Sequence, residues 1–143
     1  IISKREKVHS LQNQINAIKR GLNFSLQKAQ NKLQQANLYV TIDSVTLVAV
    51  TADKDIAFKQ MERQQKLFEE GLVSLTNLEQ RNLKYQEANA KFIGAYNKYI
   101  ASKNDLLNAE IELSSVAAEY NDKISKAESD KNNTEAEIFE AEA

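Results

Sequence analysis

The chain is short of the residues that break helices or build chemical sites. Its 143 residues include no cysteine, no proline and no tryptophan, and only three glycines. Without cysteine it can form no disulfide, no thiolate metal site and no cysteine nucleophile. What remains is rich in Lys, Glu, Gln, Asn, Ala and Leu, a composition typical of long helices rather than of a compact globular core.

Long hydrophobic runs are also missing. The most apolar stretch, LYVTIDSVTLVAVTA at residues 38–52, contains Asp43 and is shorter than the ~20 apolar residues that a transmembrane helix needs. A net charge of −1 gives no reason to expect nucleic acid or an anionic membrane as the main partner. Because the chain opens IISKREK, without an initiator Met or a signal-peptide pattern, we expect it to be a piece of a longer protein.

Patterns that would carry catalysis or ligand binding are absent from the sequence. We find no Gly-rich phosphate loop, no nucleophile elbow and no paired acid and base. His9 is the only histidine and has no nearby histidine or carboxylate cluster at metal-ligand spacing, so we expect it to be a surface residue. The sequence therefore predicts no enzyme activity, no cofactor and no metal site.

Apolar residues in the second half recur with the period of a coiled coil. The steps alternate strictly between three and four residues, which defines a heptad seam on one face of a helix. The seam positions are Tyr85, Ala88, Phe92, Ala95, Tyr99, Ser102, Leu106, Ala109, Leu113, Val116 and Tyr120, followed more weakly by Ile124, Ala127, Thr134, Ile138 and Ala141.

The first half carries a second seam, with two irregular places. Its positions are Val8, Leu11, Ile15, Ile18, Leu22, Leu26, Ala29, Leu33, Ala36, Val40, Leu47, Val50, Phe58, Met61 and Phe68. Two successive steps of four occur at 18–22–26 and, with Lys54 in the middle, at 50–54–58, which predicts a stutter at each place. Residues 39–51 are rich in β-branched side chains, which leaves a strand or kink open, although the seam resumes in phase on both sides and favours a helix.

Two long helices and a central glycine predict an all-α fold, a long antiparallel two-helix coiled-coil hairpin with a short turn at its tip. Neither helix could bury its apolar stripe alone. We expect one domain, 1–143, with arms at 1–70 and 76–143, a turn at 71–75, and residue i facing roughly residue 145 − i. Residues 1–71 hold eleven Lys or Arg against seven Asp or Glu, and residues 72–143 hold eight against thirteen, so the arms are complementary in charge.

The turn itself has a predicted geometry and an unexplained apolar content. Gly71 is placed to end the first helix in the left-handed conformation. Either Ser74 or Thr76 can cap the second helix, and the sequence leaves both open. Three apolar residues lie at the turn: Leu72, Val73 and Leu75. They either close the end of the coiled coil or form a contact site.

The stretch ERQQKLFEEGLVSLTNLEQRNLKYQEANAKF resembles the hairpin tip of the periplasmic adaptor proteins, also called membrane fusion proteins or the HlyD family. The family pattern at the tip is Arg, three residues, Leu, six residues, then Ser or Thr. Arg63, Leu67 and Ser74 match it in full, with GLVS before and Leu-Glu shortly after. The specific motif covers residues 63–79, and the rest of the chain resembles the family only in its expected architecture.

The resemblance implies a function, a set of partners and a location. Such hairpins, typically six, stand side by side as a conduit in a tripartite efflux or type I secretion system of Gram-negative bacteria. Their tips dock on an outer-membrane channel of the TolC type through positions equivalent to Arg63, Leu67 and Ser74. The full-length protein would lie in the periplasm, anchored to the inner membrane beside a transporter, and the long arms favour one of the ABC or major-facilitator type.

Plainer interpretations stay open beside this one. Arg63 can be a solvated charge, and Ser74 can do no more than cap its helix. Leu67 lies one residue before the seam position Phe68, so we expect its side chain to point away from the partner arm, where it can dock or pack on a neighbouring hairpin. The whole chain could instead be a prefoldin-like chaperone tentacle, which would need β-hairpins between the arms, or a structural coiled-coil scaffold without a function at the tip.

Overall fold

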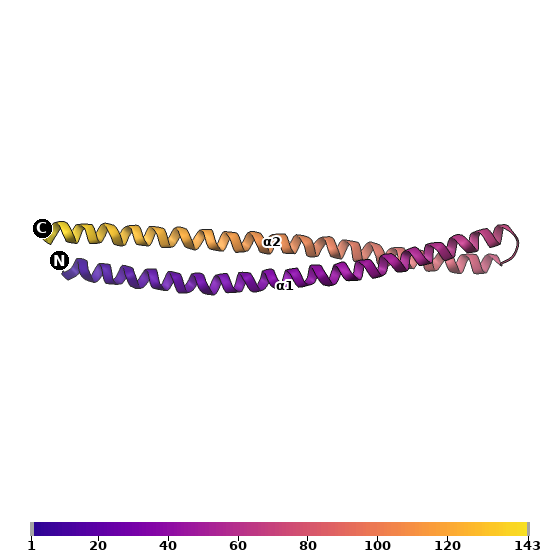
Figure 1. Ribbon diagram of the computed structural model, residues 1–143, viewed down its shortest axis with the longest axis horizontal. Coiled ribbons are helices and arrows are strands. Elements are labelled where there is room, and N and C mark those ends of the chain that lie inside the picture. The colour runs from indigo at the N-terminus through magenta and orange to yellow at the C-terminus, as the bar shows by residue number, and fades with distance from the viewer. Residues whose placement is uncertain (1, 143) are drawn as a thin grey trace. The chain divides into compact units, whose positions relative to one another are not determined.

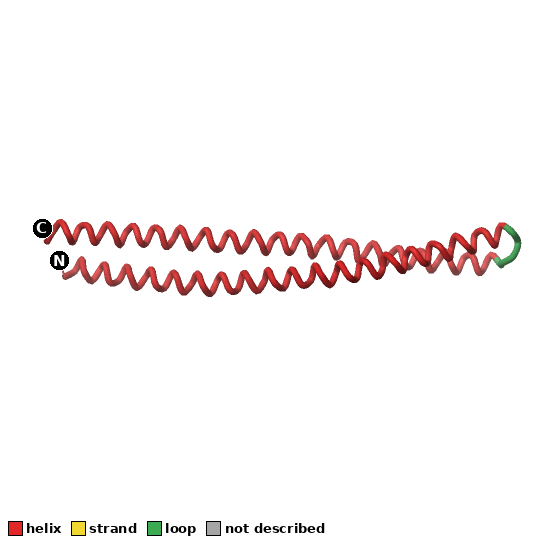
Figure 2. The backbone as a smooth tube through the Cα atoms, viewed as in Figure 1, coloured by secondary structure: helices red, strands yellow, loops and turns green. Residues whose placement is uncertain are grey.

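The chain folds as two helices joined by a short turn, the all-α hairpin that the sequence predicts. The computed structural model describes residues 2–142. In it, α1 spans Ile2–Glu69 and α2 spans Leu75–Glu142, and no strand occurs among these residues. The expected arms differ from these bounds by one residue at the turn, which lies at 70–74 (Figures 1 and 2).

Contacts divide the chain into two compact units, and each helix contributes to both. Gln35–Leu106 form one unit, called here the turn unit because it contains the turn. Ile1–Gln34 together with Leu107–Ala143 form the other, called the terminal unit. In each unit a segment of α1 lies antiparallel beside a segment of α2.

The register within each unit follows from the two seams. In the terminal unit the Ser25 hydroxyl donates to the Tyr120 hydroxyl at 3.3 Å. In the turn unit the Ser102 hydroxyl donates to the Asp43 carboxylate. Both pairs obey the expected relation between residue i and residue 145 − i.

Residues 39–51 are helical throughout, so the strand considered from their β-branched content is wrong. Two threonine hydroxyls in this region bond back to carbonyls one turn earlier: Thr41 Oγ1 to Asn37 at 3.2 Å and Thr51 Oγ1 to Leu47 at 2.6 Å. Such bonds satisfy the hydroxyls within the helix. Burial of the seam against α2 outweighs the weak local preference of these residues for a strand.

The seam of the turn unit contains polar groups that the apolar pattern passed over. Asp43 is only 4% exposed, and its carboxylate also lies 3.7 Å from the ammonium of Lys98. Lys54 occupies a half-buried seam position, with its ammonium 4.0 Å from the centre of the Phe92 ring, a cation–π contact.

The stutter expected at 50–54–58 is wrong. Ala57 is half-buried, whereas Phe58 is 43% exposed, so the seam continues from Lys54 to Ala57 and Met61 with regular heptad steps. Phe58 lies at the edge of the interface, where its ring meets Tyr85 with centroids 5.4 Å apart. The sequence pattern suggested a stutter because Lys54, a polar residue, occupies a seam position and Phe58, an apolar residue, lies beside the seam.

In the terminal unit, a few seam residues are buried and charged side chains lie along the edges of the interface. Ile15, Ala29 and Ala109 are its buried apolar residues, and Thr134 is buried with its hydroxyl bonded to the Asp130 carbonyl at 2.9 Å. Among the described residues, ion pairs between exposed side chains join the two helices along this unit, for example Lys4–Glu137 at 4.0 Å, Lys19–Glu128 at 3.9 Å and Lys32–Glu112 at 3.2 Å. Since each exposed pair contributes only ~0.2–1 kcal/mol, they select the antiparallel pairing more than they stabilise it.

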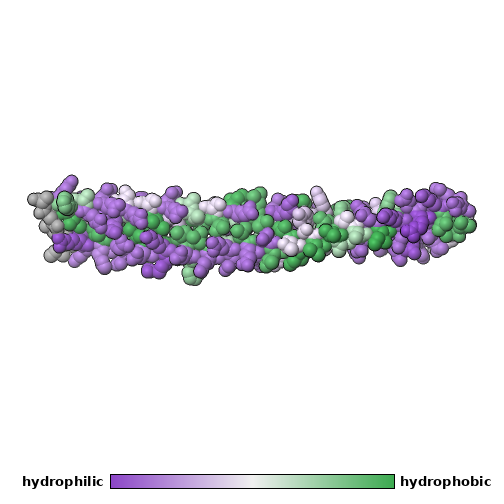
Figure 3. Space-filling view, viewed as in Figure 1, coloured by the Kyte–Doolittle hydropathy of each residue, from purple (hydrophilic) through white to green (hydrophobic). Residues whose placement is uncertain are grey.

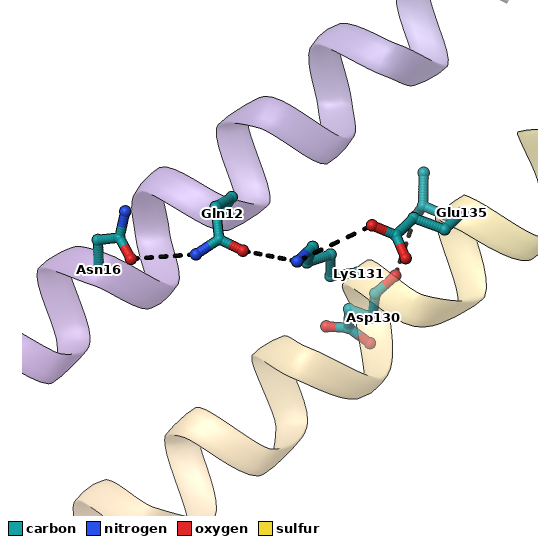
Figure 4. Close-up of polar contacts among 6 residues, drawn as sticks. Gln12, Asn16, Asp130, Lys131 and Glu135 are labelled. Atoms are coloured by element: carbon teal, nitrogen blue, oxygen red, sulfur yellow. Dashed lines mark hydrogen bonds and ion pairs between the residues drawn. The ribbon is translucent and has the colours of Figure 1, made fainter.

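A chain of polar contacts crosses between the helices in the terminal unit (Figure 4). Lys131 donates to the Gln12 side chain at 2.6 Å and lies 3.8 Å from Glu135, and the Gln12 amide donates to Asn16 at 3.0 Å. Lys131 occupies a half-buried seam position, so its long aliphatic stem fills the interface while its ammonium reaches Gln12.

The Asp43 cluster yields a stability prediction. Asp43→Ala leaves the Ser102 hydroxyl buried without an acceptor, and we expect a loss of about 1–3 kcal/mol in the free energy of unfolding. The double variant Asp43→Leu/Ser102→Ala, which removes both polar partners, should recover most of that loss because no buried group is then unsatisfied. Urea denaturation followed by circular dichroism measures both, and equal stability of the two variants would contradict the assignment.

Candidate functional site

The turn begins with a left-handed glycine that closes α1. Gly71 has φ of 76°, and its N–H donates to the Phe68 carbonyl at 3.0 Å. The next N–H, that of Leu72, donates to the Leu67 carbonyl at 2.9 Å. These two bonds form a Schellman motif with Gly71 at the residue after the cap. The role expected for Gly71 from the sequence is therefore confirmed.

The second half of the turn caps α2, and Ser74 is the cap. Its hydroxyl accepts a hydrogen bond from the Asn77 N–H at 3.2 Å, and α2 begins at the next residue, Leu75. Thr76, the alternative cap, already lies in the first turn of the helix. Val73 and Leu78 are both half-buried at the positions before the cap and in the first turn that a hydrophobic staple uses.

The apolar residues of the turn divide into covered and exposed ones. Val73 is half-buried, whereas Leu72 is 67% exposed and Leu75 is 53% exposed. Leu72 and Leu75 therefore do not close the end of the helix pair within this chain, and they leave an apolar surface beside the turn.

The three motif residues lie on both sides of the turn and differ in exposure. Arg63 and Ser74 are exposed, and the Arg63 guanidinium has no hydrogen bond or ion pair among residues 2–142. Leu67 is half-buried, although its place beside the seam residue Phe68 indicated an outward side chain. Leu67 and Leu72 occupy the two positions of the Schellman motif between which a hydrophobic contact commonly forms.

A groove beside the turn was missed by the sequence interpretation. It has a volume of about 250 Å³, and Gln64, one of its lining residues, has a side-chain oxygen that is buried without a hydrogen-bond partner in the described chain. Arg81, another lining residue, donates a hydrogen bond to the Gln60 side chain at 3.0 Å. The sequence feature that could have indicated this groove is Gln64, a polar residue at a heptad seam position. The lining residues are Gln64, Val73, Asn77, Gln80, Arg81 and Lys84.

The side chains around the turn supply apolar and hydrogen-bonding groups. Among residues 2–142 no three His, Cys, Asp or Glu side chains gather as a metal-binding group. Over the same range, neither helix has a stretch long and apolar enough to span a bilayer. Exposed Arg63, exposed leucines and a groove rich in amides can recognise another protein through hydrogen bonds and apolar contact.

Comparison of the chain with models of protein families, with curated proteins and with solved structures finds no match. The adaptor resemblance therefore depends on the residues of the tip alone.

Two glycine substitutions test the turn against a matched helical site. Gly71→Ala forces a side chain into the left-handed conformation and should lower the free energy of unfolding by about 1 kcal/mol. Gly94 lies inside α2, and a methyl group there would meet no atom within 4 Å, so Gly94→Ala should raise the free energy of unfolding by roughly 0.5–1 kcal/mol. Chemical denaturation of both variants measures the difference, and effects of the same sign would contradict this account of the turn.

Proposed function

We propose that this chain is the helical hairpin of a periplasmic adaptor protein, and that its turn docks on an outer-membrane channel of the TolC type. The proposal is carried by one observation: Arg63, Leu67 and Ser74, spaced as in the family, flank a turn that also exposes Leu72 and Leu75. An isolated three-residue pattern would be weak support in any helix, and its position at the turn makes it stronger.

The proposed task is mechanical and needs no catalysis. Several copies, typically six in the family, would stand side by side and form a conduit from an inner-membrane transporter of the ABC or major-facilitator type. The longer protein would be anchored to the inner membrane and reach through the periplasm. The Arg63 guanidinium, without a partner in the described chain, would be available to a carboxylate or backbone carbonyl of the channel.

The chaperone alternative has less support. A prefoldin-like tentacle needs β-hairpins between its helical arms, and residues 2–142 contain only helices and the turn. A structural scaffold without tip function would leave Leu72 and Leu75 exposed to water for no purpose, which costs solubility.

Charge reversal at Arg63 tests docking directly. Arg63→Asp should weaken binding of the chain to the purified channel of its own organism by at least about tenfold, the ~1.4 kcal/mol expected for one charge-assisted contact. In the longer protein the same change should reduce export. Lys59→Asp makes the same charge change at another exposed position one turn earlier in α1 and should leave binding unchanged.

Capping and docking by Ser74 can be separated in the same assay. Ser74→Asp keeps an N-cap acceptor and places a favourable charge at the start of α2, so the free energy of unfolding should stay constant or rise. If the hydroxyl also docks, channel binding should nevertheless fall about tenfold. Unchanged binding in both Arg63→Asp and Ser74→Asp, with unchanged helicity by circular dichroism, would refute docking through this motif.

A further inference from the structure

The turn unit contains a segment of α1 that is apolar on both sides. Residues 33–52 carry a single charged side chain, Asp43, and that carboxylate is buried against α2. On the outside, Val45 is 65% exposed and Val48 is 69% exposed. Figure 3 shows apolar surface gathered along the middle of α1, in the region of its label in Figure 1. A helix with solvent on one side normally carries charges there, and a helix apolar all round is normally covered all round.

The outer residues are arranged as a second heptad seam. Their steps alternate between four and three residues, as the steps of the inner seam do. They lie on the side of α1 opposite the inner seam residues Val40, Leu47 and Val50, which are half-buried against α2. We call the six residues the outer stripe: Leu38, Ile42, Val45, Ala49, Ala52 and Ile56, all exposed.

The pattern indicates what covers the outer stripe. A seam with heptad steps is complementary to another helix, because each side chain fits between four residues of a facing helix. A lipid surface is a poor match, since membrane-surface helices carry Lys or Arg beside the apolar face and residues 33–53 contain neither.

The chain itself supplies helices of the required kind. Besides the outer stripe of α1, the same unit exposes Ile93, Tyr96 and Ile100 on α2, also at steps of three and four. A second copy therefore brings two partly apolar helical surfaces with the matching period. No acidic or basic side chain on the outer stripe would be desolvated when such a helix packs on it.

We propose that the outer stripe is an interface between copies of this chain, with a helix of a second copy packed along α1 at residues 38–56. The contact uses the side of the turn unit, and it requires neither the turn nor a channel. Self-association of copies side by side is already part of the proposed function, and the inference deepens it by naming the surface through which the copies meet. The same surface would also serve a scaffold protein.

Sedimentation of the chain over a range of concentrations up to about 1 mM tests the interface. The unmodified chain should increase in mass with concentration. Ile42→Glu/Val45→Glu places two charges on exposed positions of the outer stripe, so helicity by circular dichroism should stay constant while association requires at least about tenfold higher concentration. Gln27→Glu/Gln30→Glu adds the same charges at the same spacing on exposed positions of the terminal unit and should associate like the unmodified chain.

Three results would overturn the proposal. The unmodified chain could stay monomeric at every concentration, or the Ile42→Glu/Val45→Glu variant could associate as well as the unmodified chain. The third is flotation of a monomeric chain with neutral phosphatidylcholine vesicles that the glutamate variant abolishes, because lipid would then be the occupant. Arg63→Asp separates this proposal from docking, since it should weaken channel binding and leave association of copies unchanged.

Discussion

Neither helix of this chain can bury its own apolar stripe, and the rest of the structure depends on that constraint. A helix of 68 residues has one apolar seam along its length and no globular core to receive it. The seam becomes buried only when the chain reverses and the second helix packs against the first. The central turn reverses the chain, and the complementary charges favour the antiparallel direction. The polar cluster at Asp43 favours one register.

Register is the property that an apolar seam specifies least well. Heptad positions repeat every seven residues, so a slip of one heptad keeps apolar residues facing each other. A slip would take the Asp43 carboxylate away from Ser102 and Lys98 and bury it without partners, at a cost of several kcal/mol. The Schellman turn at Gly71 and the Ser74 cap limit slippage from the other direction, because they fix the length of the connection.

The parts of the structure that the sequence predicts are those set by local period and backbone chemistry. Heptad steps located the seam of α2, and the conformational freedom of glycine located the end of α1. Three of the errors share one cause: the apolar pattern follows residue type, whereas burial depends on the angle around the helix. The apolar pattern therefore omits the seam residues Asp43 and Gln64, and it includes Phe58 in place of Ala57. Gln64 also lines the groove beside the turn. Leu67, which the heptad alone places outside, is half-buried in the last turn of α1, where the Schellman motif begins.

The outer stripe shows why a second apolar seam is hard to see beside a first. In YVTIDSVTLVAVT the inner and outer seams are interleaved, so the stretch has no polar face and reads as a strand or as an interruption. Its helical structure removes the strand, yet the helix then has an apolar side that α2 does not cover. An exposed apolar side makes a helix less soluble. Lys and Glu are frequent elsewhere in this chain, yet neither occurs in the outer stripe. The absence of charge there is consequently the feature that distinguishes this segment from the rest of α1, and it places a proposed surface for other copies on the side of the hairpin, separate from the proposed docking surface at its turn.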